Sequence, residues 1–183
     1  MIRLLDFLAA FFGLILLSPF ILIIAAILFA EHRKPFFIQN RVGKDQKLFT
    51  LIKFRSMSPK AANLPTHEIS VDLITKTGKF IRATKLDELP QLLNVLKGEM
   101  SLVGPRPCLP TQEELISERA SRGVFSLRPG ITGPAQVQNI DMSTPKKLAI
   151  EDSKMIANLK VSDYFKYVLM TVTGSGQGDK VRN

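Results

Sequence analysis

Hydrophobic residues gather in three parts of this chain, and each part has its own spacing. Residues 7–30 form one uncharged and mostly apolar run, which is typical of a membrane helix. Residues 34–54 hold two short apolar stretches on either side of Gly43-Lys44-Asp45, which predicts a hairpin of two strands. Four leucines between positions 89 and 96 recur at i, i+3, i+4 and i+7, which predicts a helix with one apolar face.

The N-terminal run, from Phe7 to Ala30, is long enough to cross a bilayer. A straight helix of this length reaches about 36 Å, against a hydrocarbon core of about 30 Å. The run is too long for a signal peptide, and its end offers no clear cleavage site. Ser18 and Pro19 lie near its midpoint. Pro19 removes a helical hydrogen bond, and the Ser18 hydroxyl can satisfy the freed carbonyl. A kinked span and a hairpin that returns to the same side both remain open.

Charges on the two flanks favour the hairpin a little. Basic residues between Arg33 and Lys44 place the C-terminal flank in the cytoplasm. Arg3 makes the other flank basic too, and Asp6, three residues later, can pair with it. A hairpin keeps both flanks on the cytoplasmic side, whereas a span separates them.

The stretch Lys85–Gly98 is the centre of the chain. Asp87 occupies an N-cap or first-turn position, where Pro90 is also tolerated, and Gly98 is a plausible end for the helix. Two adjacent carboxylates, Asp87 and Glu88, thus lie at a helix N-terminus, which favours negative charge and bound phosphate. Because anions repel, a phosphorylated substrate here would need a cation, and Mg²⁺ on Asp87 and Glu88 is the simplest one. An aspartate at an N-cap is usually only structural, and that interpretation leads on these two residues alone.

Two arginines are candidates for contact with phosphate. Arg82 precedes the carboxylates and is favoured over Lys79 and Lys85, because a guanidinium binds two phosphate oxygens at once. Arg106 follows a short buried strand at 102–103, and a proline on each side holds it in a stiff loop. Solvated surface charge and an ordinary Pro-rich turn are the alternatives.

The remaining segments are less distinctive. Residues 58–75 predict a mobile loop in which His67 is solvated, and Thr111–Arg122 predicts a helix that starts with a capping box, Thr111-Gln-Glu-Glu114. Two glycines and two prolines make residues 128–137 a turn-rich loop whose N–H groups can bind an anion.

The C-terminal part predicts two helices and a flexible tail. Pro145–Asn158 is helical by its period, and Asp163–Thr173 is apolar and aromatic. The second segment fits either a core helix or one that lies in the membrane interface. The tail begins at Gly174.

Composition adds a strong basic excess. Lys and Arg number 25 in 183 residues against 16 Asp and Glu, a net charge of +9. Such a charge suits nucleic acid, an anionic membrane surface or phosphorylated substrates. Nucleic-acid binding predicts aromatic residues among the basic ones, and Lys79–Arg106 has few. Cys108 is the only cysteine, so an intrachain disulfide is excluded and a reducing compartment fits.

The order of motifs resembles a known family, the bacterial sugar transferases that act as monotopic polyprenyl-phosphate phosphoglycosyl transferases. The resemblance runs from Arg3 to about Val137, and the size matches the minimal catalytic form. Its most specific part is the block Leu86–Pro107. The other motifs, in order, are Arg3-x-x-Asp6, Ser18-Pro19, Gln39-Asn-Arg-Val-Gly43, Lys53-Phe-Arg-Ser-Met57 and Arg128-Pro-Gly-Ile-Thr-Gly133.

The resemblance implies a reaction and roles for individual residues. A sugar-1-phosphate would pass from a UDP-sugar to a polyprenyl phosphate, expected to be undecaprenyl phosphate, with release of UMP. Asp87 would be the nucleophile and form an acyl-phosphate, Glu88 would help to hold Mg²⁺, and Arg106 would clamp the nucleotide. The other candidates for substrate contact are Arg82, Arg55 and Arg128.

The resemblance also implies a fold and a location. We expect an α/β protein, mostly helical with a short β-hairpin. Residues 1–32 would form a re-entrant helix-break-helix with Ser18-Pro19 at the break. Residues 33–183 would form a small catalytic domain with interfacial amphipathic helices. The place would be the cytoplasmic face of the bacterial inner membrane, at the first membrane step of surface-glycan or glycoprotein-glycan assembly. Expected partners are membrane lipids and downstream glycosyl transferases, with no nucleic acid. A homodimer is compatible with the sequence.

One departure leaves the sugar open. Pro134 stands where many relatives carry a bulkier residue, and no Asn-Gly-Arg follows Gln136-Val137. Two other functions remain as alternatives. One is a membrane-anchored glycosyl transferase that releases UDP, which needs no nucleophilic Asp87. The other is a basic, membrane-tethered binding module without enzyme activity.

Overall fold

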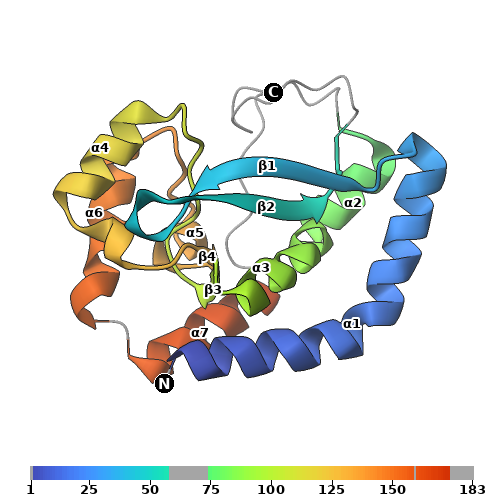
Figure 1. The fold of residues 1–183 in the computed structure, drawn as a ribbon, viewed down its shortest axis with the longest axis horizontal. Coiled ribbons are helices and arrows are strands. Elements are labelled where there is room, and N and C mark those ends of the chain that lie inside the picture. Colours follow the sequence, from blue (N-terminus) through green and yellow to red (C-terminus); the bar gives the residue numbers. More distant parts are fainter. Residues whose placement is uncertain (1, 58–73, 159, 174–183) are drawn as a thin grey trace.

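The computed structural model describes residues 2–57, 74–158 and 160–173, and shows a long bent helix wrapped around a small, mostly helical domain (Figure 1). The expected loop at 58–75 with His67, and the expected tail, fall almost wholly outside these residues. The elements in chain order are α1 Ile2–His32, β1 Phe36–Val42, η1 Lys44–Gln46, β2 Leu48–Phe54, α2 Lys76–Ala83, η4 Leu86–Gln91, α3 Leu92–Lys97, β3 Ser101–Val103, α4 Glu113–Ser121, η5 Val124–Ser126, β4 Gly130–Thr132, α5 Pro134–Val137, α6 Pro145–Asn158 and α7 Val161–Val172.

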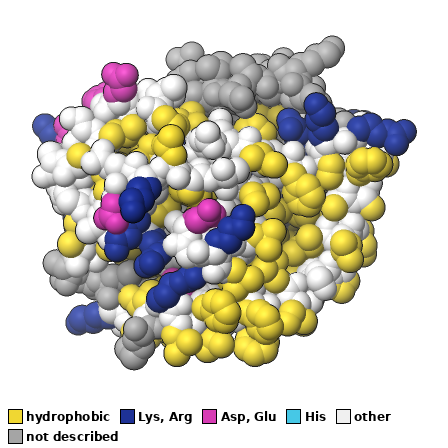
Figure 2. All heavy atoms as spheres, viewed as in Figure 1, with side chains coloured by type: hydrophobic (Ala, Val, Ile, Leu, Met, Phe, Trp, Pro, Cys, Tyr) yellow, Lys and Arg dark blue, Asp and Glu magenta, His cyan; other side chains and the backbone are white. Residues whose placement is uncertain are grey.

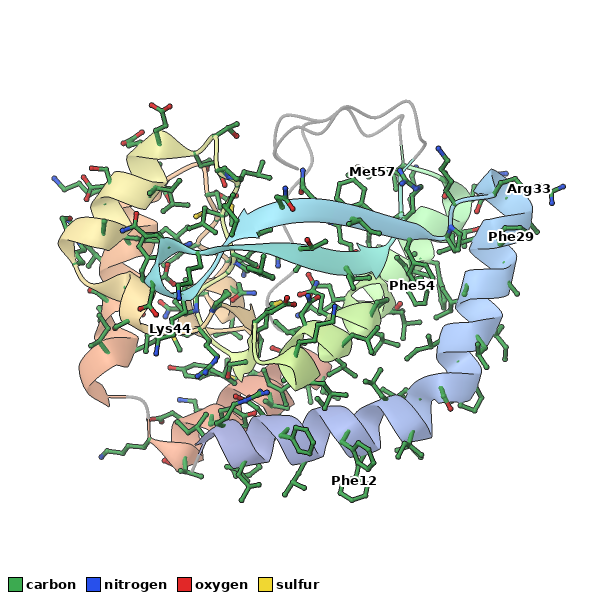
Figure 3. All side chains as sticks on the ribbon, viewed as in Figure 1. Phe12, Phe29, Arg33, Lys44, Phe54 and Met57 are labelled. Atoms are coloured by element: carbon green, nitrogen blue, oxygen red, sulfur yellow. The ribbon has the colours of Figure 1, made fainter. Side chains whose placement is uncertain are left out.

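Helix α1 is bent like the letter L. Its two arms are seen in Figure 1, and Phe12 lies on one arm while Phe29 lies on the other (Figure 3). Pro19 is inside the helix between them. The Ser18 hydroxyl donates to the Ile15 carbonyl at 2.8 Å, the acceptor that an N–H at position 19 would have used. The helix bends here but is not interrupted, so the helix-break-helix stays a prediction, whereas the expected role of Ser18 is confirmed.

Both arms of α1 pack against the domain. In the first arm, Ala10 shares a hydrophobic cluster with Leu92 and Val95 of α3. In the second arm, Leu28 shares another cluster with Phe54 of β2 and with Ile81. The outer side of the helix remains apolar and uncovered, and Figure 2 shows this hydrophobic surface over both arms. The exposed large hydrophobic residues of α1 are Leu4, Phe7, Leu8, Phe11, Phe12, Ile15, Leu16, Phe20, Leu22, Ile23, Ile27 and Phe29.

Arg3 caps the far end of α3 rather than pairing with Asp6. Its guanidinium donates to the carbonyls of Val95 at 2.6 Å and Leu96 at 2.9 Å. A cation at this end of a helix also complements the macrodipole. Gly98 ends α3 with φ +84°, so the expected stop at this glycine is confirmed.

Asp6 is buried and accepts three hydrogen bonds from the domain. Its Oδ1 receives the Ser101 hydroxyl at 2.9 Å and the Leu102 N–H at 2.9 Å, both from β3. The Tyr164 hydroxyl of α7 donates to the same oxygen at 2.7 Å. Because buried polar groups need partners, these bonds tie α1 to β3 and α7. The expected Arg3–Asp6 pair was wrong, since each side chain finds its partners far away in the sequence.

The predicted hairpin is confirmed as the antiparallel pair β1–β2, with Phe36 opposite Phe54 and Val42 opposite Leu48. Asn94 of α3, which is fully buried, attaches the leucine-rich helix to it. Its Nδ2 donates to the Thr50 carbonyl at 2.7 Å, and its Oδ1 accepts the Ile52 N–H at 3.2 Å.

A second sheet joins β3 and β4 in parallel, so the short strand expected at 102–103 is confirmed. Residues 128–137 are not simply a loop, because they contain β4 and the short helix α5. The capping box expected at 111–114 was also wrong. Helix α4 begins after Gln112, which makes no side-chain cap, and the Gln112 Oε1 accepts the Leu109 N–H instead. The predicted helices at 145–158 and 163–173 are confirmed, the second starting at Val161.

Gly130 permits two backbones to cross behind the loop that carries Arg106. The Gly130 N–H donates to the Pro105 carbonyl at 2.9 Å, and a Cβ at this position would lie 2.0 Å from the Gly104 nitrogen. We expect Gly130→Ala to lower the free energy of unfolding by about 2–3 kcal/mol, because the backbones must separate. Thermal unfolding in detergent measures this. Gly13→Ala is the matched control, since its Cβ would meet Leu92 at an ordinary 3.6 Å. Equal melting of both variants would contradict the expectation.

Candidate active site

Asp87 lies in the first turn of η4, a short 3₁₀ helix that precedes α3. The helix expected from Asp87 onward is therefore divided, with Pro90 inside the 3₁₀ part. Lys85, just before η4, has φ +58°, a left-handed conformation that turns the chain sharply into the helix. Asp87 is only 7% exposed, because η4 packs against β2 and α2.

Glu88 binds Arg106 across the site. The Nη1 atom of Arg106 donates to Oε1 of Glu88 at 3.1 Å, and both side chains are partly buried. The sequence placed both residues in the site without predicting this contact. It joins the start of η4 to the Pro-Arg-Pro loop, eighteen residues later.

Several cations act on the buried carboxyl of Asp87. The pKa of Asp87 is raised to about 6, because burial and the negative charge of Glu88, which raise it, outweigh Lys53, Arg82 and Arg106, which lower it. Burial also lowers the pKa of Lys53 to about 8, opposed by the charge of Asp87. The two carboxylates thus share their surroundings with three cations, an arrangement that attracts a multiply charged anion.

Arg82 reaches the site from α2. Its Nη1 donates to the Ser56 hydroxyl at 3.4 Å, just beyond the end of β2. Helix α2 lies this close because Gly78 faces the Ser56 backbone, where a Cβ would meet the Ser56 carbonyl oxygen at 1.9 Å. The structure therefore brings together Asp87, Glu88, Arg82 and Arg106, as the sequence predicted.

Arg55 and Arg128 make backbone contacts at other places. Arg55 donates to the carbonyls of Lys34 at 3.1 Å and Phe36 at 3.2 Å. It also shares the Phe37 ring with Lys53, which places it beside the site. Arg128 donates to the Gly98 carbonyl at 2.9 Å, at the end of α3 away from Asp87. Roles for these two arginines in substrate binding stay predictions.

A comparison with protein families agrees with this geometry. The model of the family described as bacterial sugar transferase matches residues 1–177. The chain belongs to this family. It is similar to the uncharacterized sugar transferase EpsL of Bacillus subtilis (strain 168), with 44% identity over 154 residues, which cover 81% of this chain and 74% of EpsL.

Two further relatives carry names that state a reaction. The UDP-N-acetylgalactosamine-undecaprenyl-phosphate N-acetylgalactosaminephosphotransferase of Aeromonas hydrophila is 41% identical, over 72% of this chain and 32% of that protein. The UDP-glucose:undecaprenyl-phosphate glucose-1-phosphate transferase of Klebsiella pneumoniae is 42% identical, over 74% of this chain and 30% of that protein. This sugar transferase thus spans about a third of the length of these two relatives.

Sequence reasoning missed several residues that shape this sugar transferase's site. Lys53 continues the face of β2 that buries Phe49 and Leu51, and a lysine on a buried face is a signal that alternation could have given. Arg119 and Asp152 gave no such signal, because their partners are distant in the sequence.

Among the residues that the structure describes, no cluster of three or more His, Cys, Asp or Glu side chains could hold a metal by itself. Mg²⁺ at nucleotide sites is commonly held by one or two carboxylates together with substrate phosphates. The side chains of Asp87 and Glu88 supply such a pair of carboxylates. The donor set therefore fits a Mg²⁺ ion that arrives with a phosphorylated substrate.

Proposed function

We propose that this sugar transferase moves a sugar-1-phosphate from a UDP-sugar to undecaprenyl phosphate and releases UMP. The observation that carries the proposal is the buried Asp87 beside Glu88, with Lys53, Arg82 and Arg106 close enough for their charges to act on Asp87. Relatives whose names state this type of reaction support it. The step would be the first membrane step in building a surface glycan or a glycoprotein glycan.

The transfer proceeds in two displacements on one phosphorus atom. An Asp87 oxygen attacks the sugar-bearing phosphorus, and the bond from that phosphorus to the bridging oxygen breaks, so UMP leaves with the electron pair. A phosphate oxygen of the lipid then attacks the same phosphorus, and the bond to Asp87 breaks. The carboxylate returns to its first state, so the two substrates need not bind together.

The basic residues give the site its preference for a diphosphate. Arg106 is positioned by its contact with Glu88, and it would clamp the nucleotide part of the donor through its planar guanidinium. Arg82 and Lys53 would balance the charge that builds up on the phosphoryl oxygens. Asp87 and Glu88 would hold Mg²⁺, which when bound neutralises charge on the diphosphate.

We propose that α1 is a re-entrant hairpin with the site at the cytoplasmic surface. Residues Ile2–Glu31 have the length and hydropathy of a membrane helix. Arg3 and Asp6 at one end bind the domain, and β1 of the same domain follows the other end. Both flanks therefore lie beside one domain, which a straight span would prevent.

The topology has a direct test. Single cysteines placed before Arg3 and after Lys34, in a Cys108→Ser background, should both react with an impermeant reagent from the cytoplasmic side only. Reaction from opposite sides would overturn the hairpin and leave the proposed chemistry intact.

The activity test reads the nucleotide product. The purified chain, in detergent or nanodiscs, is incubated with Mg²⁺, undecaprenyl phosphate and a panel of UDP-sugars. UMP formed with one donor supports the proposal and identifies the sugar. UDP as the product would favour a glycosyl transferase. Binding to anionic vesicles without release of any nucleotide would favour a non-enzymatic module.

The pH profile should be bell-shaped. Asp87 must be an anion to attack, so kcat/KM for UMP release should rise with pH up to about 6 and level off above it. Lys53 should lose its proton near pH 8, so the rate should fall above that pH. Lys53→Arg keeps its charge at high pH and should abolish the alkaline fall. A fall near pH 8 that persists in this variant would assign that limb to another group.

A further inference from the structure

Three consecutive carbonyls hold the loop that carries Arg106, and each accepts a hydrogen bond from a different element. The Pro105 carbonyl accepts from the Gly130 N–H at 2.9 Å. The Arg106 carbonyl accepts from Arg119 Nη1 at 2.8 Å. The Pro107 carbonyl accepts from Arg41 Nη1 at 3.0 Å. Because the two prolines have no N–H to donate, the loop depends on these carbonyls for its position.

The donor to the Arg106 carbonyl, Arg119, belongs to a buried ion pair. Arg119 of α4 and Asp152 of α6 have side chains 2% and 1% exposed. The Nε and Nη2 atoms of Arg119 donate to Oδ2 of Asp152 at 3.0 and 2.7 Å. With two donors fixed on the carboxylate, the third nitrogen of the planar guanidinium is aimed at the Arg106 carbonyl.

Burying an ion pair between two helices, here α4 and α6, carries a large desolvation cost. Desolvation commonly offsets its attraction, and apolar side chains of similar volume can replace it without loss of stability. An apolar pair, however, offers no donor to a carbonyl. The feature that only Arg119 supplies here is therefore the bond to Arg106, whose own side chain contacts Glu88 at 3.1 Å.

We propose that Arg119, oriented by Asp152, is a positioning residue that fixes Arg106 in the active site. A continuous chain of contacts leads from Asp152 through Arg119 and the Arg106 backbone to Glu88. The functional consequence rests on the proposed phosphosugar transfer, whereas the structural one does not. The Arg119 side chain is too deeply buried to touch a substrate, so its effect on the site passes through the loop that carries Arg106.

The first test separates positioning from folding. The double variant Arg119→Met/Asp152→Leu replaces the ion pair with apolar side chains and removes the donor to Arg106. We expect its melting temperature to stay near that of the native chain, while kcat/KM for UMP release falls about 10- to 100-fold, the effect of a small misplacement. Arg119→Lys is the second variant if the double variant does not fold, because an ammonium keeps the charge but lacks the planar fork that directs one nitrogen to the Arg106 carbonyl while two others hold Asp152.

The matched control is Arg122, the residue that directly follows α4. Arg122 also pairs with a carboxylate, Glu118, four residues earlier, and it donates further hydrogen bonds to the Glu118 carbonyl and the Ser121 hydroxyl of its own helical turn. Arg122→Lys should leave kcat/KM unchanged. In an Arg106→Ala background, the Arg119 variants should cause little further loss, since their target is gone. If the Arg119 variants lowered kcat/KM by the same factor in the Arg106→Ala background as in the native chain, Arg119 would have a merely structural role and the proposal would be overturned.

A readout without activity distinguishes this inference from the proposed reaction. Hydrogen exchange in the peptide covering residues 101–109 should become faster in the Arg119 variants and stay unchanged in Arg122→Lys. A native chain that releases no UMP, with faster exchange in the Arg119 variants, would reject the reaction and keep the positioning role. Native exchange and native kcat/KM in both Arg119 variants would reject the positioning role.

Discussion

Asp87→Asn should reduce UMP release by at least about 10³-fold while the protein stays folded. An amide has the shape of the carboxylate but is a very poor nucleophile, and removal of a covalent nucleophile has effects of this size or larger. Burial already disfavours the charge of Asp87, whose pKa is raised to about 6. The neutral side chain should therefore not destabilise η4. Initial rates of UMP formation with the donor found in the panel measure the effect.

The companion experiment looks for the intermediate itself. Without lipid phosphate, the native chain should release about one equivalent of UMP and gain the mass of a sugar-phosphate on a peptide that contains Asp87. Asp87→Asn should show neither. Glu88→Gln is the control, since it removes the neighbouring charge and keeps the proposed nucleophile. If Asp87→Asn released UMP at the native rate, Asp87 would be excluded as the nucleophile, although the reaction type would stand.

Asp6→Ala should cost about 3–5 kcal/mol in the free energy of unfolding. The change leaves the Ser101 hydroxyl, the Leu102 N–H and the Tyr164 hydroxyl without their acceptor. Each buried donor that loses its partner costs about 1–3 kcal/mol. These three bonds also attach α1 to the domain, so proteolysis between α1 and β1 should become faster. Thermal unfolding in one fixed detergent measures the first effect.

Two milder variants test whether the destabilisation increases with the number of hydrogen bonds lost. Tyr164→Phe removes a single donor and should cost about 1 kcal/mol. Asp6→Asn keeps an acceptor oxygen and should fall between the two. Native melting of Asp6→Ala would mean that water or the detergent replaces the carboxylate, and that the three bonds do not hold α1 in place.

Hydrophobic spacing and the positions of glycine, proline and serine predicted much of the fold. The apolar stretches around Gly43-Lys44-Asp45 predicted the hairpin β1–β2, and the leucine period with Gly98 predicted α3 and its end. The bend in α1 could be predicted because proline and serine act on the turn of helix directly before them. In each case the signal and the structure lie within a few residues.

The sequence could not show what depends on distant partners. Asp6 lies 95 residues from Ser101 and 158 from Tyr164, so its nearest charge, Arg3, was the reasonable guess. Strand β4 has only three residues and exists because β3 pairs with it. Arg119 and Asp152 are polar residues in amphipathic helices, and nothing local marks them as buried. The site was found through acidic and basic residues near each other in the chain, and its scaffold was not.

The packing of α1 means that the membrane segment and the catalytic domain form one folding unit. Leu92 and Val95 meet the first arm, and Phe54 and Ile81 meet the second, so removal of α1 would open two core clusters at once. These clusters adjoin α3 and β2, which are the elements on either side of Asp87. With α1 in the membrane as proposed, a bilayer that bends or thins around this helix is expected to change the geometry around Asp87, so the rate of the proposed reaction should depend on the lipid composition.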